Sequence, residues 1–147
     1  MLDTVYSQIG AGIAILVLLF AFLKGDEPER IASAAFALVI LVGLASPISS
    51  GADGVRWGLM SLDVLLLAVL CGLAWHSRRT WLIWASAFQS LIVTSHVLIL
   101  ADLRPPSNAF AAVNNLSNYG LLIALGVGTF WAWQERRASG LDKVRRP

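Results

Sequence analysis

Five polar side chains that could do chemistry lie inside long apolar stretches of this chain. Asp63 lies in the third stretch, Gln89 and His96 lie in the fourth, and Asn114 and Asn118 lie in the fifth. A carboxylate in the hydrocarbon of a bilayer costs about 2.5 kcal/mol or more unless it is paired or hydrated. Asp63 is therefore the strongest candidate for a functional or partner-binding residue.

The spacing of these residues predicts one polar site. At about 1.5 Å per residue, Asp63, His96 and Asn114 lie at one depth, and Gln89 and Asn118 lie about one turn deeper. Gln89 and His96 are seven residues apart, so they share one side of a helix. The pattern predicts a polar pocket in the outer half of the membrane, walled by the third, fourth and fifth helices.

Two kinds of chemistry could use such a pocket. Asp63 and His96 could carry protons in a small transporter or a proton-conducting protein. Alternatively, the pocket could belong to a redox or pigment protein that binds a quinone, or in which His96 ligates a haem or a chlorophyll-type pigment, with Met60 as a second ligand. His76 lies at the opposite end of its helix, which excludes a haem held by both histidines of one chain.

A purely structural interpretation also fits these side chains. Asn, Gln and Ser side chains in transmembrane helices commonly bond to a neighbouring helix, at about 0.6 kcal/mol per bond. Asp63 and His96 alone supply too few ligands for a metal site. The sequence contains no nucleophile–base pair, phosphate-binding loop or carboxylate pair, so we do not expect an enzyme.

Five apolar stretches must position these residues. Most contain the roughly 20 residues that a helix needs to cross about 30 Å of hydrocarbon. The fold class predicted is therefore all-α, a bundle of five transmembrane helices. The stretches are residues 5–23, 31–46, 55–75, 81–101 and 111–133.

Local signals refine the ends of two helices. Asp26 and Glu29 have the spacing of a capping box, so residues 27–30 are expected to form the first turn of the second helix. The short segment 77–80 predicts a tight turn, with Thr80 as the N-cap of the fourth helix. The third and fourth helices are then antiparallel neighbours.

The basic residues predict the orientation of the bundle. If the amino terminus is outside, nine basic residues fall on the cytoplasmic side and only Arg56 and Arg104 fall outside, which follows the positive-inside rule. The nine are Lys24, Arg30, Arg78, Arg79, Arg136, Arg137, Lys143, Arg145 and Arg146.

The tryptophans predict the same orientation. Trp57 marks the outer interface, and the other five are expected in an aromatic belt at the inner one. These five are Trp75, Trp81, Trp84, Trp131 and Trp133.

Composition defines the class of protein. Hydrophobic residues make up 57% of the chain and charged residues 14%, with a mean hydropathy of +0.71, which excludes a soluble domain of this length. We expect one membrane domain over residues 1–137 and a basic cytoplasmic tail over 138–147, in a bacterial inner membrane. The net charge of +2 reflects orientation in the bilayer and implies no nucleic-acid partner. Cys71, the single cysteine, is expected to be a small packing residue.

Small residues at four-residue spacing predict close helix packing. Gly120, Ala124 and Gly128 form such a face on the fifth helix. The face serves either packing within the bundle or docking to another subunit. Because no complete chemical site accompanies it, the leading hypothesis is a small integral subunit or accessory protein of a larger inner-membrane complex, with other membrane proteins as partners. The proton and cofactor hypotheses above are the alternatives.

Overall fold

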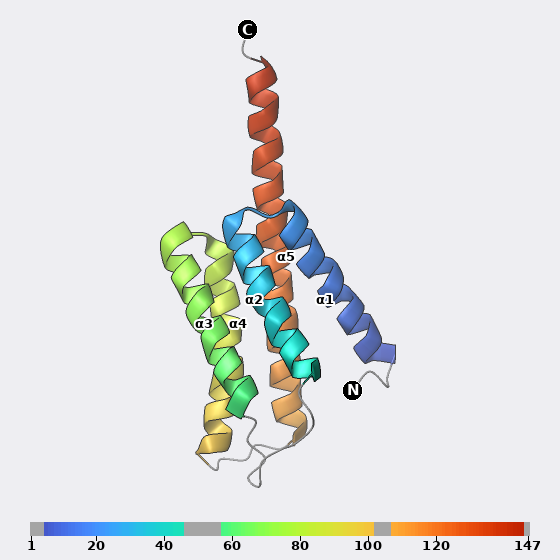
Figure 1. The fold of residues 1–147 in the computed structure, drawn as a ribbon, viewed down its shortest axis with the longest axis vertical. Coiled ribbons are helices and arrows are strands. Elements are labelled where there is room, and N and C mark those ends of the chain that lie inside the picture. Colours follow the sequence, from blue (N-terminus) through green and yellow to red (C-terminus); the bar gives the residue numbers. More distant parts are fainter. Residues whose placement is uncertain (1–4, 46–56, 102–106, 146–147) are drawn as a thin grey trace.

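Five helices alternate in direction along the chain (Figure 1). The computed structural model describes the backbone of residues 5–45, 57–101 and 107–145, and the side chains of 8–45, 57–101 and 108–140. The amino end of α1 lies at one end of the bundle, and α5 projects beyond the other. The helices are α1 (Val5–Lys24), α2 (Glu27–Ala45), α3 (Trp57–Ser77), α4 (Thr80–Leu100) and α5 (Ser107–Arg145).

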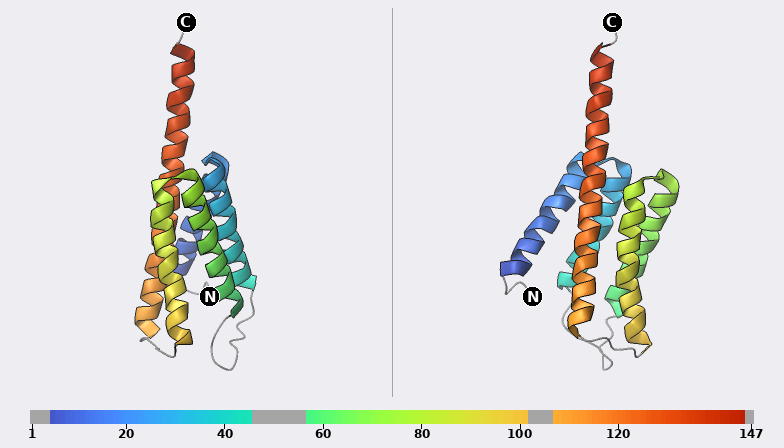
Figure 2. Two further views of the ribbon diagram at one scale, coloured as in Figure 1. Left: turned by 90° about the vertical axis from the view of Figure 1, so that its left-hand side faces the viewer. Right: turned by 180° about the vertical axis from the view of Figure 1, so that it is seen from behind.

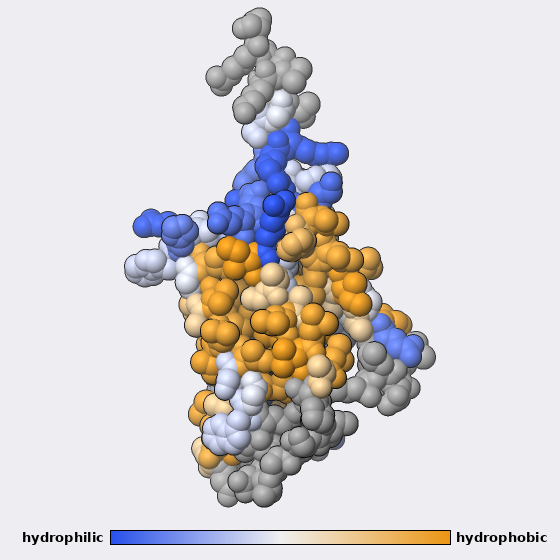
Figure 3. Space-filling model, viewed as in Figure 1, coloured by the Kyte–Doolittle hydropathy of each residue, from blue (hydrophilic) through white to orange (hydrophobic). Residues whose placement is uncertain are grey.

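Four of these helices are long and apolar enough to cross a bilayer. They are α2, α3, α4 and the segment Asn108–Gly140 of α5, whereas the described apolar segment of α1, Gln8–Lys24, is shorter. Large apolar side chains cover the outside of the bundle, for example Leu16 and Leu116, which are 69% and 70% exposed. Figure 3 shows this apolar surface below a polar collar where α5 leaves the bundle. The fold is an all-helical bundle consistent with a multi-pass membrane protein.

The α1–α2 connection follows the sequence prediction. The backbone N–H of Asp26 donates a hydrogen bond to Glu29 Oε2 at 2.9 Å, which is the capping-box bond, and α2 begins at Glu27. Gly25 precedes this cap, and its N–H donates to the carbonyl of Ala21 at 2.9 Å. A Cβ on Gly25 would lie 2.3 Å from that carbonyl oxygen and 2.4 Å from Glu29 Cβ, so the close approach requires glycine.

The α3–α4 connection is shorter than predicted and is capped differently. Only Arg78 and Arg79 separate the helices, and Arg78 adopts a positive φ of 51°. Arg79 is the N-cap, in extended conformation and without a side-chain cap hydrogen bond, so the prediction that Thr80 caps α4 is wrong. The physical reason is that Thr80 already lies inside the first turn, while the Arg79 side chain pairs with acids on other segments.

Helix α5 is the longest helix and lies at the centre of the packing. It packs most extensively against α4 and also contacts α1 and α2, while α3 packs against α2 and α4. Helix α1 diverges from the bundle toward its amino end (Figures 1 and 2). The buried core includes Leu66, Leu70, Leu82, Leu121 and Leu125.

The end of α5 and the exposure of Cys71 differ from what the sequence predicted. Helix α5 begins at Ser107 and continues to Arg145, well past the predicted end at residue 133, so the tail expected over 138–147 continues α5 as far as it is described. Cys71 is exposed on α3, so its prediction as a packing residue is wrong. Arg56 and Arg104 lie outside the described residues.

Candidate functional site

Asp63, Gln89 and His96 form a hydrogen-bonded cluster between α3 and α4. His96 Nε2 lies 2.9 Å from Asp63 Oδ2, and Gln89 Nε2 donates to Asp63 Oδ1 at 3.1 Å. The same Gln89 nitrogen also lies 3.1 Å from the backbone carbonyl of Asp63. Both carboxylate oxygens of Asp63 therefore have a partner from the neighbouring helix.

The short α3–α4 turn explains why these three residues meet. In two antiparallel helices joined by two residues, side chains at equal distances from the turn lie side by side. Counted in this way, Asp63 lies between the levels of Gln89 and His96. Gln89 and His96 share one side of α4 because they are seven residues apart. Gln89 therefore contacts Asp63 from the side nearer the α3–α4 turn, and His96 contacts it from the side farther from the turn.

The cluster is mostly removed from solvent. The side chain of Asp63 is 14% exposed, that of His96 is 21% exposed, and Gln89 is completely buried. With neutral imidazole, Nε2–H donates to the carboxylate; with protonated imidazole, the same contact is an ion pair.

The predicted residues of α5 do not join this hydrogen-bonded cluster within the described part of the chain. Asn118 Nδ2 donates to the carbonyl of Asn114 at 2.9 Å, which is a bond within its own helix. Asn114 Oδ1 and Ser117 Oγ are buried and have no hydrogen-bond partner among the described residues. The same holds for Gln89 Oε1 and for Ser86 Oγ on α4.

An ion network at the opposite end of the bundle was not predicted from the sequence. Arg79 contacts Asp26 at 2.8 Å, and Asp26 also contacts Arg136 Nε at 3.2 Å. Arg79 lies 3.8 Å from both Glu29 and Glu135, and Arg136 donates to the backbone carbonyl of Lys24. The network ties the α1–α2 turn, the α3–α4 turn and α5 together. The sequence signal that could have predicted this network is the presence of opposite charges at the ends of three predicted helices.

Glu29 is the most deeply buried charged residue of this network. Its side chain has no exposed surface, and its Oε1 accepts a hydrogen bond from Trp81 Nε1 at 2.9 Å. Trp81 itself is only 4% exposed, so its assignment to a lipid-facing aromatic belt is wrong. Its indole is held inside the bundle by Glu29, whereas Trp75, Trp84 and Trp131 are exposed.

Aromatic rings of α4 pack against two glycines of α5. A Cβ on Gly120 would lie 2.6 Å from the Phe88 ring, and one on Gly128 would lie 2.4 Å from the Trp81 ring. Ala124, between them, is 8% exposed. The small face predicted on α5 therefore lies against α4 over this length.

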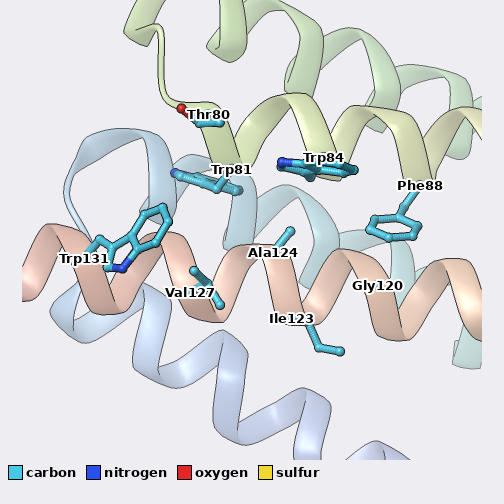
Figure 4. A pocket seen from close by; sticks show the side chains of 9 residues that line it. All are labelled: Thr80, Trp81, Trp84, Phe88, Gly120, Ile123, Ala124, Val127 and Trp131. Atoms are coloured by element: carbon cyan, nitrogen blue, oxygen red, sulfur yellow. The ribbon is translucent and has the colours of Figure 1, made fainter.

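An apolar groove follows the same α4–α5 seam, and we call it the α4–α5 groove (Figure 4). Its volume is about 330 Å³. It is lined by Thr80, Trp81, Trp84 and Phe88 of α4, and by Gly120, Ile123, Ala124, Val127 and Trp131 of α5.

The structure bears on the cofactor alternative through His96. Its Nε2 contacts Asp63, so a haem or pigment would have to bind Nδ1. Within the described residues, no group of three or more His, Cys, Asp or Glu side chains is arranged to hold a metal ion.

No protein-family model, curated protein or solved structure matches this chain. The functional argument therefore depends on the residues and their geometry.

Proposed function

We propose that this chain is a small multi-pass membrane protein that binds and transfers protons through Asp63 and His96. The observation that carries the proposal is the 2.9 Å contact between Asp63 Oδ2 and His96 Nε2 inside an apolar bundle. We place the protein in a cell membrane, with five spans and the basic end of the bundle in the cytoplasm. A bacterial inner membrane is the membrane that we favour.

A carboxylate and an imidazole in contact are suited to hold one exchangeable proton. Ionisable residues within membrane spans are rare and commonly belong to proton relays or ion pathways. Both side chains retain some exposure, 14% and 21%, so protons can reach them. Gln89 fixes the carboxylate by bonding to its second oxygen, which keeps Oδ2 directed at the imidazole.

Unpaired buried polar atoms on α4 and α5 support this proposal. Gln89 Oε1, Asn114 Oδ1, Ser117 Oγ and Ser86 Oγ are buried and have no partner among the described residues. Buried polar groups in native proteins almost always have hydrogen-bond partners, including water. Such groups can carry a hydrogen-bonded chain away from Asp63 and His96 toward the interior of the bundle.

Proton flux into liposomes tests the proposal. The purified protein is reconstituted with an internal pH dye, and a potassium gradient with valinomycin drives protons inward. We expect the wild-type protein to acidify the lumen faster than protein-free liposomes do. Asp63→Asn and His96→Gln should return the rate to that background, because each removes one half of the pair.

His76→Gln is the matched control, because it makes the same substitution at an exposed histidine at the other end of α3. It should conduct like the wild-type protein. Wild-type liposomes that acidify no faster than empty ones would contradict proton conduction.

A second candidate function, an integral subunit of a larger membrane complex, is favoured by the length of α5. Residues 137–140, past the ion network, are exposed and continue α5 beyond the bundle (Figure 2). A helix of a few turns is marginal in water on its own, so a partner would stabilise this extension. If so, the particle in mild detergent should be larger than one chain. Deletion of 138–147 should release the partner and leave a particle of a single chain. A single-chain particle before deletion would rule this candidate out.

A further inference from the structure

A polar recess adjoins the α4–α5 groove at the basic end of the bundle. The recess has a volume of about 390 Å³, and its charged lining residues are Arg78, Arg79 and Glu135. Thr80, Trp81 and Trp131 line both the recess and the groove, so the two cavities adjoin at these residues. Figure 4 shows Trp81 and Trp131 near Thr80 at one end of the groove, with Phe88 and Gly120 at the other. One amphipathic ligand could therefore occupy both.

We propose that the recess and the groove together bind one anionic phospholipid, with its phosphate beside Arg78 and one acyl chain along α4 and α5. This site is separate from Asp63 and His96 and does not depend on proton transfer. The occupant belongs to the leaflet at the basic end of the bundle.

The charge of the recess favours an anionic headgroup. Arg79 is committed to Asp26 at 2.8 Å, but the exposed Arg78 forms no ion pair within the described residues. Glu135 is the opposing charge; it lies 3.8 Å from Arg79 and its side chain is 73% exposed. The two arginines and one glutamate leave the recess with a net positive charge, and Arg78 is the cation available to a phosphate.

The first turn of α4 adds to this attraction. Its N-cap, Arg79, forms no side-chain cap hydrogen bond, so the positive end of a 21-residue helix is open toward the recess. Backbone N–H groups at helix amino ends bind phosphates readily. The amino end of α4 therefore adds to the attraction of Arg78 for a phosphate, and the helix need not change conformation to do so.

The groove suits an acyl chain in length and chemistry. From Thr80 to Phe88 it follows α4 for about 12 Å, close to the ~15 Å hydrocarbon depth of one leaflet. Its lining is dominated by aromatic rings and by the aliphatic side chains of Ile123 and Val127. A partner helix would fill the apolar groove but would give Arg78 no negative partner. A phospholipid fills the groove with an acyl chain and places its phosphate beside Arg78.

Native mass spectrometry of the full chain tests this proposal. The delipidated protein is mixed with equal amounts of phosphatidylglycerol and phosphatidylcholine that carry the same acyl chains. We expect one retained lipid per chain, with phosphatidylglycerol preferred. Arg78→Gln should reduce that preference about fivefold, which is the usual contribution of one arginine at an anionic membrane surface. Glu135→Gln should increase it, because it removes the opposing charge.

Two further variants test the groove. Ile123→Trp and Val127→Trp place a large ring in it from lipid-facing positions and should reduce retention of both lipids. The matched controls are Arg30→Gln, an exposed arginine at the same end on α2, and Ile83→Trp, an exposed residue of α4 outside the groove. Both controls should bind lipid like the wild-type protein.

Three outcomes would overturn the proposal. Equal losses in Arg78→Gln and Arg30→Gln would indicate diffuse surface charge. Unchanged retention in both groove variants would show that no acyl chain enters the groove. Inorganic phosphate that binds through Arg78 and displaces phosphatidylglycerol at equal concentration would identify an ion site instead of a lipid site.

Discussion

At the scale of single residues, the buried acids of this bundle are held by partners from another helix. Asp63 on α3 is bonded by Gln89 and His96 of α4, and Glu29 on α2 is bonded by Trp81 of α4. A buried charge that loses its partner destabilises a protein by several kcal/mol. Helix α4 therefore bonds an acid of α3, against which it packs, and an acid of α2, which Trp81 reaches at the basic end of the bundle.

The Glu29–Trp81 bond allows a direct test of this arrangement. Trp81→Phe keeps an aromatic ring over Gly128 but removes the donor to Glu29 Oε1. We expect it to lower the free energy of unfolding by about 1.5–3 kcal/mol, the range for a hydrogen bond to a charged group. Reversible denaturation in mild detergent measures the change. Trp84→Phe, at a 62% exposed position, is the control, and equal losses in both variants would show that the bond contributes nothing.

The meeting of Asp63, Gln89 and His96 could be predicted from the sequence, but the burial of Trp81 could not. Helical periodicity and a short turn determine which faces of α3 and α4 oppose each other. Trp81 lies at the depth of an aromatic belt whether it faces lipid or protein, so periodicity alone does not distinguish the two. Its partner, Glu29, is 52 residues away in sequence.

At the scale of secondary-structure elements, the glycines of α5 determine how closely α4 approaches. Rings of Phe88 and Trp81 occupy the space where side chains of Gly120 and Gly128 would be. In lipid, helix association depends on such close packing more than on hydrophobicity. The α4–α5 seam is accordingly the most extensive contact in the bundle.

Alanine substitutions at two glycines should have different effects, because only one of the glycines lies against a ring. Gly128→Ala places a Cβ against the Trp81 ring and should destabilise the protein by about 1–3 kcal/mol through overpacking. Gly72→Ala on α3 meets nothing within 4 Å and should be neutral or stabilising by up to about 1 kcal/mol, because alanine favours helix. Thermal unfolding in detergent measures both. A stabilising Gly128→Ala would contradict the close approach of the two helices.

Element boundaries were predicted best where a local signal fixes them. The capping box fixes the start of α2, and the beginnings of α1, α3 and α4 lie within two residues of the predicted ones. Helix α5 is the exception, because Gln134, Glu135 and Arg136 signal the end of an apolar span without breaking a helix. Polarity marks the exit from a membrane, whereas only a cap or a proline ends the helix itself.

At the scale of the whole molecule, the alternation of the helices collects the described basic residues at one end. Lys24, Arg30, Arg78 and Arg79 lie at or next to the ends of helices that meet there, and Arg136 and Arg137 lie where α5 leaves the bundle. Figure 3 shows the resulting polar collar above the apolar surface. By the positive-inside rule, we propose that this is the cytoplasmic end.

Cysteine labelling from outside the cell tests this orientation. In a Cys71→Ala background, single cysteines at Ser50 and Ser107 should react with a membrane-impermeant reagent, while those at Ser77 and Ser139 should not. Labelling after permeabilisation is the control for reactivity. External labelling at Ser77 would contradict the proposed five-span orientation.

The measurement that tests the central claim most directly is a double-mutant cycle on Asp63 and His96, read by unfolding in detergent between pH 5 and 8. Asp63→Asn and His96→Gln should show a coupling free energy of about 0.5–3 kcal/mol, the range for residues in contact. Effects that add within about 0.5 kcal/mol at every pH would contradict a shared proton-binding site.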